Sequence, residues 1–351
     1  MTSPDSGAST TADLPDYAPI PRSALGPALN DQGYYVGRVE RNLYWVTDGV
    51  YNSAFLTTGD GVVVFDAPPS IGNNLRRAVD EIAAANGVPN TVTHLVYSHH
   101  HADHAGAASL FGGDVTRIGH QETRRLLERD GDPARPLPEI TFTDRYTLQV
   151  GGERVELAWY GPNHTPDNIY IHFPGHDTLM FIDVVNAGWV PIYNVNLSED
   201  VIGYMGVPAV ALSYPWTHFI SGHLGRLATR DDVAVHQAYI ADIEASAREA
   251  LASVDPVPYY VAAGENFWAG VKATSTPLPN ARPRLSSPST PACWPPRTSR
   301  SSPSPPPSRS CSRCAWTAGP ADRSIPDQDA SGAGKVRPRR GPGGASADGR
   351  L

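Results

Sequence analysis

Cysteine is nearly absent from this 351-residue chain. Its only three cysteines, Cys293, Cys311 and Cys314, all lie in the last quarter, so the preceding residues cannot form a disulfide framework. This distribution is typical of a reducing compartment. Cys311 and Cys314 have the spacing of a zinc or redox pair, but no second pair accompanies them, and we do not count them as a site.

Long apolar runs are also missing. No stretch approaches the ~20 apolar residues that a membrane-spanning helix needs. The first residues carry neither the positively charged region nor the apolar region of a secretory signal. We therefore expect a cytoplasmic protein that has no membrane partner.

Basic residues are scarce in most of the chain and concentrated at its end. From residue 277 onward, twelve Lys and Arg residues stand against four Asp and Glu, whereas the whole chain has a net charge of -8. Residues 1–276 therefore carry a net charge of -16. Such an acidic body argues against nucleic acid as the main partner and favours a small-molecule substrate. The sequence leaves the oligomeric state open.

Composition divides the chain into three regions: a flexible lead-in over 1–32, a folded domain over 33–276 and a tail over 277–351. The tail holds fifteen of the 34 prolines, and we expect it to be disordered because it offers too little apolar surface to bury. The chain has 26 Arg and two Lys, which indicates GC-rich codons. Out-of-frame translation of such codons yields Pro, Arg and Ser. A frame shift near Pro277 and a natural basic tail therefore both stay open, and resequencing the gene distinguishes them.

The folded region alternates between strand and helix patterns. Apolar runs separated by glycine-containing turns predict an antiparallel meander at 43–46, 53–56 and 62–65. Further strands are expected at 94–97, 115–118, 147–150, 155–160, 168–173, 178–182 and 217–220, and helices at 75–86, 122–129, 199–212 and 230–253. Ser198-Glu199-Asp200 is the expected cap of the third helix. Together they predict an α+β fold with two sheets back to back and helices outside, a four-layer αββα sandwich.

The most informative run follows the strand expected at 94–97. His99, His101, Asp103 and His104 form the pattern H-x-H-x-D-H. Imidazole and carboxylate are the ligand types that hold zinc, and imidazole also suits iron. Small residues follow this run, so we expect the ligands in a turn between a strand and a helix, where α/β proteins usually build their sites.

A two-metal centre needs more than four ligands. His164, Asp183 and His223 each follow a β-type run, and in two packed sheets such strand ends converge on one edge. His100 alternates with its neighbours on an extended backbone, so we expect it to face away from them. The remaining histidines are expected to be structural or exposed to solvent: His94, His120, His172, His176, His218 and His236.

This set of residues resembles the metallo-β-lactamase superfamily, over roughly residues 35–270. The resemblance implies the αββα fold and a binuclear site, usually of zinc, between the sheets. It assigns His99, His101 and His164 to the first metal, Asp103, His104 and His223 to the second, and Asp183 to a bridge between them. An Asp at the bridging position is similar to glyoxalase II and lactonase members and unlike the β-lactamases that have Cys there.

The chemistry expected of such a centre is hydrolysis. Two metals can share a water and lower its pKa towards ~7, so that the resulting hydroxide attacks the carbonyl of a small ester, lactone, thioester or lactam. Asp103 is placed to orient this hydroxide and pass on its proton, as the catalytic residue. Trp189 and Tyr193 follow the bridging Asp183 and are candidates for the substrate pocket.

Two alternatives stay open. A mono-iron oxygenase that resembles the persulfide dioxygenases of the same superfamily would use His99, His164 and Asp183 as iron ligands. An inactive product of a damaged gene is the other, because the family usually has more helix and strand after residue 277. Metal analysis distinguishes the mono-iron oxygenase from the two-zinc hydrolase. Protease resistance of residues 35–270 would argue against an inactive product of a damaged gene.

Overall fold

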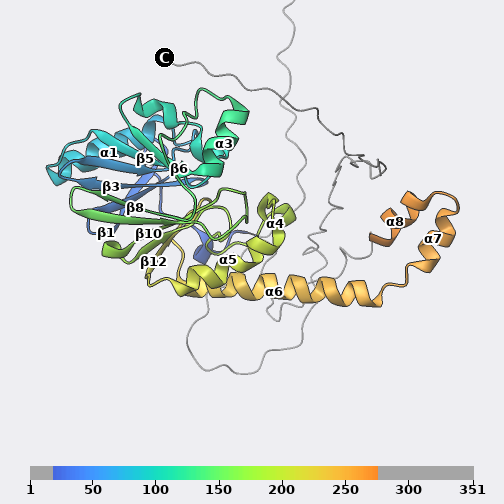
Figure 1. Cartoon of the computed structure of the whole chain (residues 1–351). Coiled ribbons are helices and arrows are strands. Elements are labelled where there is room, and N and C mark those ends of the chain that lie inside the picture. Colours follow the sequence, from blue (N-terminus) through green and yellow to red (C-terminus); the bar gives the residue numbers. More distant parts are fainter. Residues whose placement is uncertain (1–18, 276–351) are drawn as a thin grey trace, which may run out of the picture. The chain divides into compact units, whose positions relative to one another are not determined.

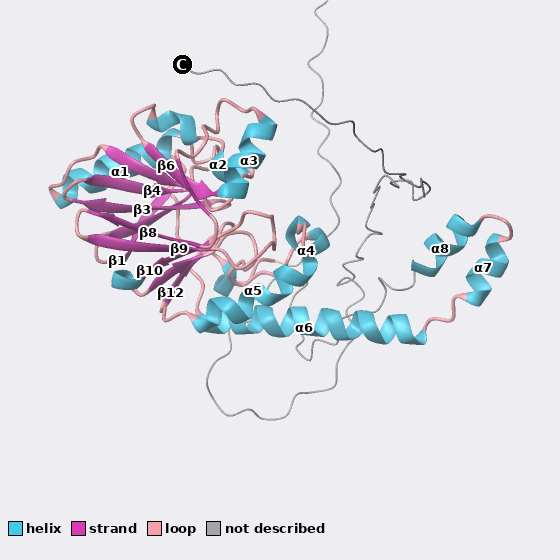
Figure 2. Ribbon diagram, viewed as in Figure 1, coloured by secondary structure: helices cyan, strands magenta, loops and turns pink. Residues whose placement is uncertain are grey.

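The computed structural model describes residues 19–275, and its strands form two sheets (Figures 1 and 2). The first sheet has seven strands in the order β1 to β7, and the second has five in the order β12, β11, β10, β9 and β8. The tail expected at 277–351, with its three cysteines, lies outside the described residues.

The strands of the first sheet are β1 (Tyr35–Glu40), β2 (Leu43–Thr47), β3 (Asn52–Thr58), β4 (Gly61–Phe65), β5 (Val92–Val96), β6 (Thr116–His120) and β7 (Ile140–Phe142). Those of the second are β8 (Arg145–Val150), β9 (Glu153–Ala158), β10 (Tyr170–Phe173), β11 (Thr178–Met180) and β12 (His218–Ile220). The helices are α1 (Asn73–Asn86), α2 (Ala102–Ala105), α3 (Gln121–Asp130), α4 (Tyr193–Leu197), α5 (Val201–Ser213), α6 (Arg230–Ser253), α7 (Val257–Ala263) and α8 (Phe267–Ser275).

Three apolar clusters separate four layers. Strand β4 shows why: Val62 and Val64 pack towards α1, whereas Val63 and Phe65 point into the space between the sheets. Successive strand side chains face opposite sides, so a strand that is buried on both faces is apolar throughout. A third cluster joins the outer face of the second sheet to α5 and α6. The fold is therefore the expected αββα sandwich, with α1 outside one sheet and α5 and α6 outside the other (Figure 2).

Most elements lie where the sequence pattern predicts them. Strands β2, β3 and β4 form the antiparallel meander, and α6 covers the residues expected. The predicted cap segment 198–200 does hold the cap of α5, but the helix begins two residues later than predicted. The carboxylate of Asp200 accepts the amide of Gly203 at 2.7 Å and caps the helix, while the Ser198 hydroxyl donates to the Asn163 carbonyl at 3.0 Å.

Five elements were not predicted from the sequence, namely β1, β7, α4, α7 and α8. Strand β7 has only three residues, too few for a periodic pattern to show. Helices α7 and α8 pack on each other, with the rings of Tyr260 and Phe267 stacked at 5.6 Å. Within residues 19–275, no helix is long and apolar enough to cross a membrane.

Parallel pairing brings the candidate ligands to one edge. Strands β4, β5 and β6 run parallel to one another in the first sheet, and β11 and β12 do so in the second. Parallel strands end on the same side of a sheet, so the loops that follow β5, β11 and β12 meet there. Six of the seven candidate ligands lie in the segments after β5, β11 and β12, and His164 lies in the loop between β9 and β10.

Candidate metal centre

Seven side chains gather into two groups that share one carboxylate. In each group, one ligand atom per residue lies within 4.8 Å of the others. The first group consists of His99, His101, His164 and Asp183, and the second of Asp103, His104, Asp183 and His223. The structure thus brings together all seven residues that the sequence singled out, in the two sets that the family resemblance implied.

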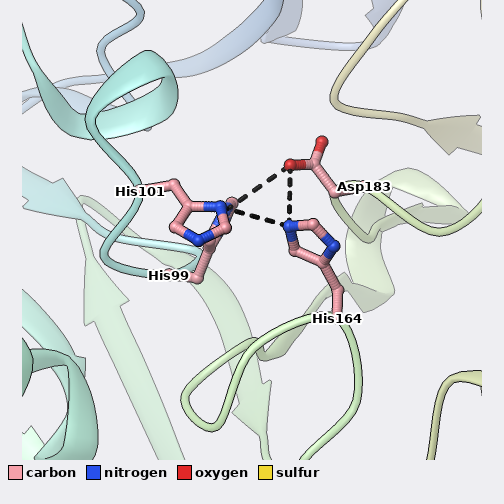
Figure 3. Close-up of side chains that lie close together, drawn as sticks. All are labelled: His99, His101, His164 and Asp183. Atoms are coloured by element: carbon pink, nitrogen blue, oxygen red, sulfur yellow. Dashed lines mark hydrogen bonds and ion pairs between the residues drawn. The ribbon is translucent and has the colours of Figure 1, made fainter. Parts of the chain in front are cut away.

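In the first group, the side chains of His99, His101, His164 and Asp183 lie close together (Figure 3), and all are buried except His101, which is half-buried. The Nε2 atoms of His99 and His164 lie 3.6 Å and 3.3 Å from Oδ2 of Asp183. His164 Nε2 also lies 3.2 Å from Nδ1 of His101. Two imidazoles therefore direct ring nitrogens at one carboxylate oxygen, and the third meets His164.

The second group lies on the other side of the same carboxylate. His104 Nε2 is 3.1 Å from Oδ2 of Asp183, and His223 Nε2 is 3.1 Å from Oδ1. The two imidazole nitrogens are 3.2 Å apart. Asp103 Oδ2 completes the group at 3.5 Å from His104 Nε2 and 3.7 Å from His223 Nε2.

Backbone geometry aims Asp183 at both groups. Asp183 follows β11 with a φ of 64°, a left-handed conformation that is uncommon outside glycine. The side-chain amide of Asn196 donates to the backbone carbonyl of Asp183 at 3.0 Å and to that of Val184 at 3.3 Å. These hydrogen bonds hold the turn in this conformation, so its strain is offset by the surroundings.

The loop of His164 is fixed by two asparagines. Asn163 Oδ1 accepts the His164 amide at 2.7 Å and the Asn168 side-chain amide at 3.0 Å. Asn168 also donates to the carbonyl of Ile182, the residue before Asp183, at 2.9 Å. This network ties the His164 loop to the Asp183 loop.

Burial and charge separate the titration behaviour of the ligands. Burial lowers the pKa of His99 well below its usual value and that of His101 to about 4, so both are neutral near pH 7. Burial also disfavours the charged form of His104, but the Asp183 carboxylate outweighs it and raises the pKa of His104 to about 9. Burial likewise opposes ionisation of Asp183. The charge of His104 and the hydrogen bonds that Asp183 accepts from surrounding histidines outweigh burial and hold the pKa of Asp183 well below its usual value.

The donor set fits a metal. His99 Nε2 is fully buried, points into the first group and has no hydrogen-bond partner. Two pairs of imidazole nitrogens meet at 3.2 Å, an arrangement that suits lone pairs converging on a cation. Three imidazoles with a carboxylate are a usual ligand set for zinc or iron.

Supporting contacts lie behind the first group. The Ser98 hydroxyl is 2.9 Å from His99 Nδ1, and the Ser98 amide donates to Asp66 Oδ1 at 2.8 Å. His100 contacts Asp167 at 2.9 Å through its Nδ1. Metal-binding histidines are commonly oriented through their second ring nitrogen, which is the position Ser98 occupies here.

The other histidines behave differently. Within the described residues, none of those expected to be structural or exposed joins a group that could hold a metal. His100 joins one further group, with His101 and the exposed Glu199. Of the six expected to be structural, His176 is buried against Asn42 at 2.8 Å, whereas His218 is one-third exposed.

Sequence reasoning missed Tyr51, which lies between β2 and β3. Its ring centroid is 4.7 Å from that of His223 and 5.7 Å from that of His104. The turn Asp48-Gly49 marks a hairpin, but nothing in the local pattern shows that the hairpin meets the loop after β12. Of the two pocket candidates, Trp189 is half-buried, and the side chain of Tyr193 is outside the described ones.

Residues 46–264 match the family model described as the metallo-beta-lactamase superfamily. The chain belongs to this superfamily. The match covers more than half of the chain and contains all seven clustered side chains. The membership supports both the sandwich and the presence of a metal site within it.

Curated relatives within the superfamily carry different names. The chain is 26% identical over 220 residues to the 2,4-dinitroanisole O-demethylase subunit alpha of Nocardioides sp. (strain JS1661), a match that covers 61% of this chain and 63% of the relative. It is 29% identical over 150 residues to the metallo-beta-lactamase IND-1 of Chryseobacterium indologenes, covering 40% of this chain and 60% of the relative. The chain thus spans about three-fifths of the length of either relative.

A solved structure shows the same fold. A metallo-beta-lactamase from Pontibacter korlensis superposes with a TM-score of 0.50 at 17% identity, over 59% of this chain and 99% of that one. At this identity the likeness shows the architecture alone. Among metallo-β-lactamase superfamily members, reaction and substrate therefore have to be argued from the side chains of the site.

Proposed function

We propose that the protein is a two-metal hydrolase, with zinc as the metal, that cleaves a small ester, lactone, thioester or lactam. The observation that carries the proposal is the shared position of Asp183. Its two carboxylate oxygens lie 3.1 Å from His223 Nε2 and 3.3 Å from His164 Nε2, one in each group. A carboxylate between two complete ligand sets is the arrangement expected of a bridging ligand.

The proposed roles follow the two groups. His99, His101 and His164 would hold the first zinc, and Asp103, His104 and His223 the second. When bound, the two ions would supply Lewis acidity and an activated water. Their ligands must be deprotonated, so binding the second ion would displace the proton that Asp183 holds on His104.

Asp103 is proposed to act on protons as well. Its side chain is 41% exposed, whereas the His104 side chain beside it is fully buried. A carboxylate at this boundary can accept a hydrogen bond from a reacting water and exchange its proton with solvent. Within the second group, Asp103 is the ligand best placed for this exchange.

The substrate we propose is small and uncharged near its reacting carbonyl. Residues 184–200, which follow the bridging Asp183 and include Trp189 and Tyr193, contain no Lys or Arg. Recognition of a substrate carboxylate usually uses such a cation. Neutral lactones and esters should therefore be cleaved in preference to analogues that carry a carboxylate beside the scissile bond.

The experiment is metal analysis of the full chain alongside a panel of lactone, thioester and β-lactam substrates. We expect two zinc ions per chain, and activity that a chelator removes and zinc restores. His223→Ala should lose one ion and most activity. The matched variant His218→Ala, at the start of β12 and outside both groups, should retain both ions.

Other results would point elsewhere. One iron per chain with oxygen consumption would favour the dioxygenase alternative, in which the first group acts alone. No bound metal and rapid proteolysis of residues 35–270 would favour the damaged-gene alternative. We further propose the domain limits 33–276 and a cytoplasmic location, which fractionation of the native cells would test.

A further inference from the structure

The segment that carries Tyr51 is joined to the loop that carries His223. Tyr51 and His223 face each other in an isolated antiparallel bridge. The Leu224 amide donates to the Val50 carbonyl at 2.8 Å, and the Asn52 amide donates to the Gly222 carbonyl at 2.9 Å. The two backbones therefore hold Tyr51 in a fixed position beside His223.

The turn before Tyr51 is also rigid. Asp48 Oδ1 accepts the amides of Val50 and Tyr51, at 2.9 Å and 2.7 Å. The Asn52 side chain donates to the Ser221 carbonyl at 3.0 Å, on the opposite side of Tyr51. Hydrogen bonds on both sides of Tyr51 leave its backbone little freedom, so its side chain is presented in one direction.

That direction is towards the second group. Tyr51 lies obliquely against the His223 ring and meets the His104 ring edge-on. Burial and the neighbouring Asp103 carboxylate raise the pKa of its phenol. Because a carboxylate only accepts, the phenol would donate in a hydrogen bond between the two. Within residues 19–275, both aromatic ring contacts of Tyr51 go to histidines of the second group.

The second group is the one that needs such support. The side chains of Asp103 and His223 are 41% and 25% exposed, whereas those of His99 and His164 are almost completely buried. Buried ligands are held by the packing around them. Partly exposed ligands have fewer neighbours, and contacts from outside the coordination sphere then decide how well they are oriented.

We propose that Tyr51 is a positioning residue that sets the affinity of the second metal ion. The inference rests on the two-metal centre proposed above. The ring of Tyr51 would hold the imidazole of His223, and its hydroxyl would hold the carboxylate of Asp103. The first ion, whose three histidines Tyr51 does not contact, would bind independently of it.

The test is a zinc titration of the metal-free full chain against a chromophoric chelator, which resolves two binding steps. Tyr51→Phe removes the hydroxyl and keeps the ring, and Tyr51→Ala removes both. We expect second-step affinity to fall about 10-fold in the first variant and about 100-fold in the second, with the first step unchanged. The matched control is Tyr35→Ala. Tyr35 is a half-buried tyrosine in β1, the edge strand of the same sheet, and its ring packs on Trp45 of β2.

The outcomes separate the inference from the proposed function. If the wild type binds two ions and both Tyr51 variants match it, the inference is overturned and the two-metal centre stands. Equal weakening of both steps, with a lower unfolding temperature of the metal-free variant, would also overturn it by showing a role in folding. If the wild type binds a single ion, the proposed two-metal centre fails before any variant is made, and the inference fails with it.

Discussion

The two ligand groups share Asp183 but differ in the protein that surrounds them. In the first group, His99, His164 and Asp183 are buried, and burial lowers the pKa values of His99 and His101, so these two are neutral near pH 7. The second group lies nearer solvent, and its His104 is held as a cation by Asp183. The first group is therefore organised by the core of the sandwich, and the second by individual contacts at its rim.

This difference predicts which changes affect one ion and which affect both. Changes to the shared carboxylate should remove the whole centre. Changes to residues that contact the partly exposed second group should affect the second ion. Changes to Ser98, which follows β5 and contacts His99, should affect the first ion. The following predictions test that division, from the largest expected effect to the smallest.

Asp183→Ala should abolish binding of both ions, because no other side chain in the described residues joins both groups. The loss of about 4 kcal/mol or more of transition-state stabilisation corresponds to a rate lower by ~10³-fold or more. Elemental analysis and turnover measure the effect. A variant that retained one tightly bound ion would show that the groups are less dependent on each other than their shared ligand indicates.

Asp103→Ala should lower activity by about 10²- to 10⁴-fold, the usual contribution of a positioned proton-transfer group. The first ion should stay bound, because Asp103 belongs only to the second group. Steady-state kinetics with parallel metal analysis check both points. Unchanged turnover would refute the role proposed for Asp103.

Gly222→Ala should disturb the centre through sterics alone. A Cβ at this position would lie 2.3 Å from Asp183 Oδ1 and 3.0 Å from the His104 ring, so the carboxylate has to move. We expect weaker binding of both ions, by about 10-fold or more. Gly206→Ala in α5 is the control, because a Cβ there meets nothing within 4 Å. Equal metal affinities in the two variants would contradict the prediction.

Ser98→Ala should weaken only the first ion, by about 10-fold, because the Ser98 hydroxyl contacts the second ring nitrogen of His99. It is the counterpart of Tyr51→Phe in the other group. The two variants, titrated side by side with zinc, should lower opposite binding steps. If both lowered the same step, the division into two separately supported groups would be wrong.

The smallest effect concerns pH. In the metal-free protein, the pKa of His104 is raised to about 9, so its contribution to stability is complete below its usual pKa of about 6.5 and is lost as pH rises towards 9. The pKa of His101 is lowered to about 4, so stability falls as pH drops from about 6.5 towards 4, where the unfolded chain takes up the proton first. The unfolding temperature of the wild type should fall at both alkaline and acidic pH. His104→Gln should lose only the fall at alkaline pH.

Much of the first sheet could be predicted because strands β2, β3 and β4 are buried on both faces. The meander of β2, β3 and β4 follows from three apolar runs and two turns, and α6 from a long Ala-rich pattern. Which residue of the predicted segment 198–200 caps α5 could not be predicted, because Ser198 and Asp200 are both good caps by residue type. A tertiary contact decides between them: the Ser198 hydroxyl donates to the backbone carbonyl of Asn163, in another loop, and so does not cap the helix.

The sequence by itself determined the ligand types and the strand ends that carry them, since both are local properties of residue order. The tertiary structure decided how these ligands are grouped. His104 and His223 are 119 positions apart, yet their ring nitrogens meet at 3.2 Å because parallel strands of two packed sheets end at one edge. It also decided that Tyr51 reaches the second group, because only the packing of a hairpin against the loop after β12 places them together. Periodicity shows which face of a strand is buried, but the contacts between loops depend on how the sheets pack.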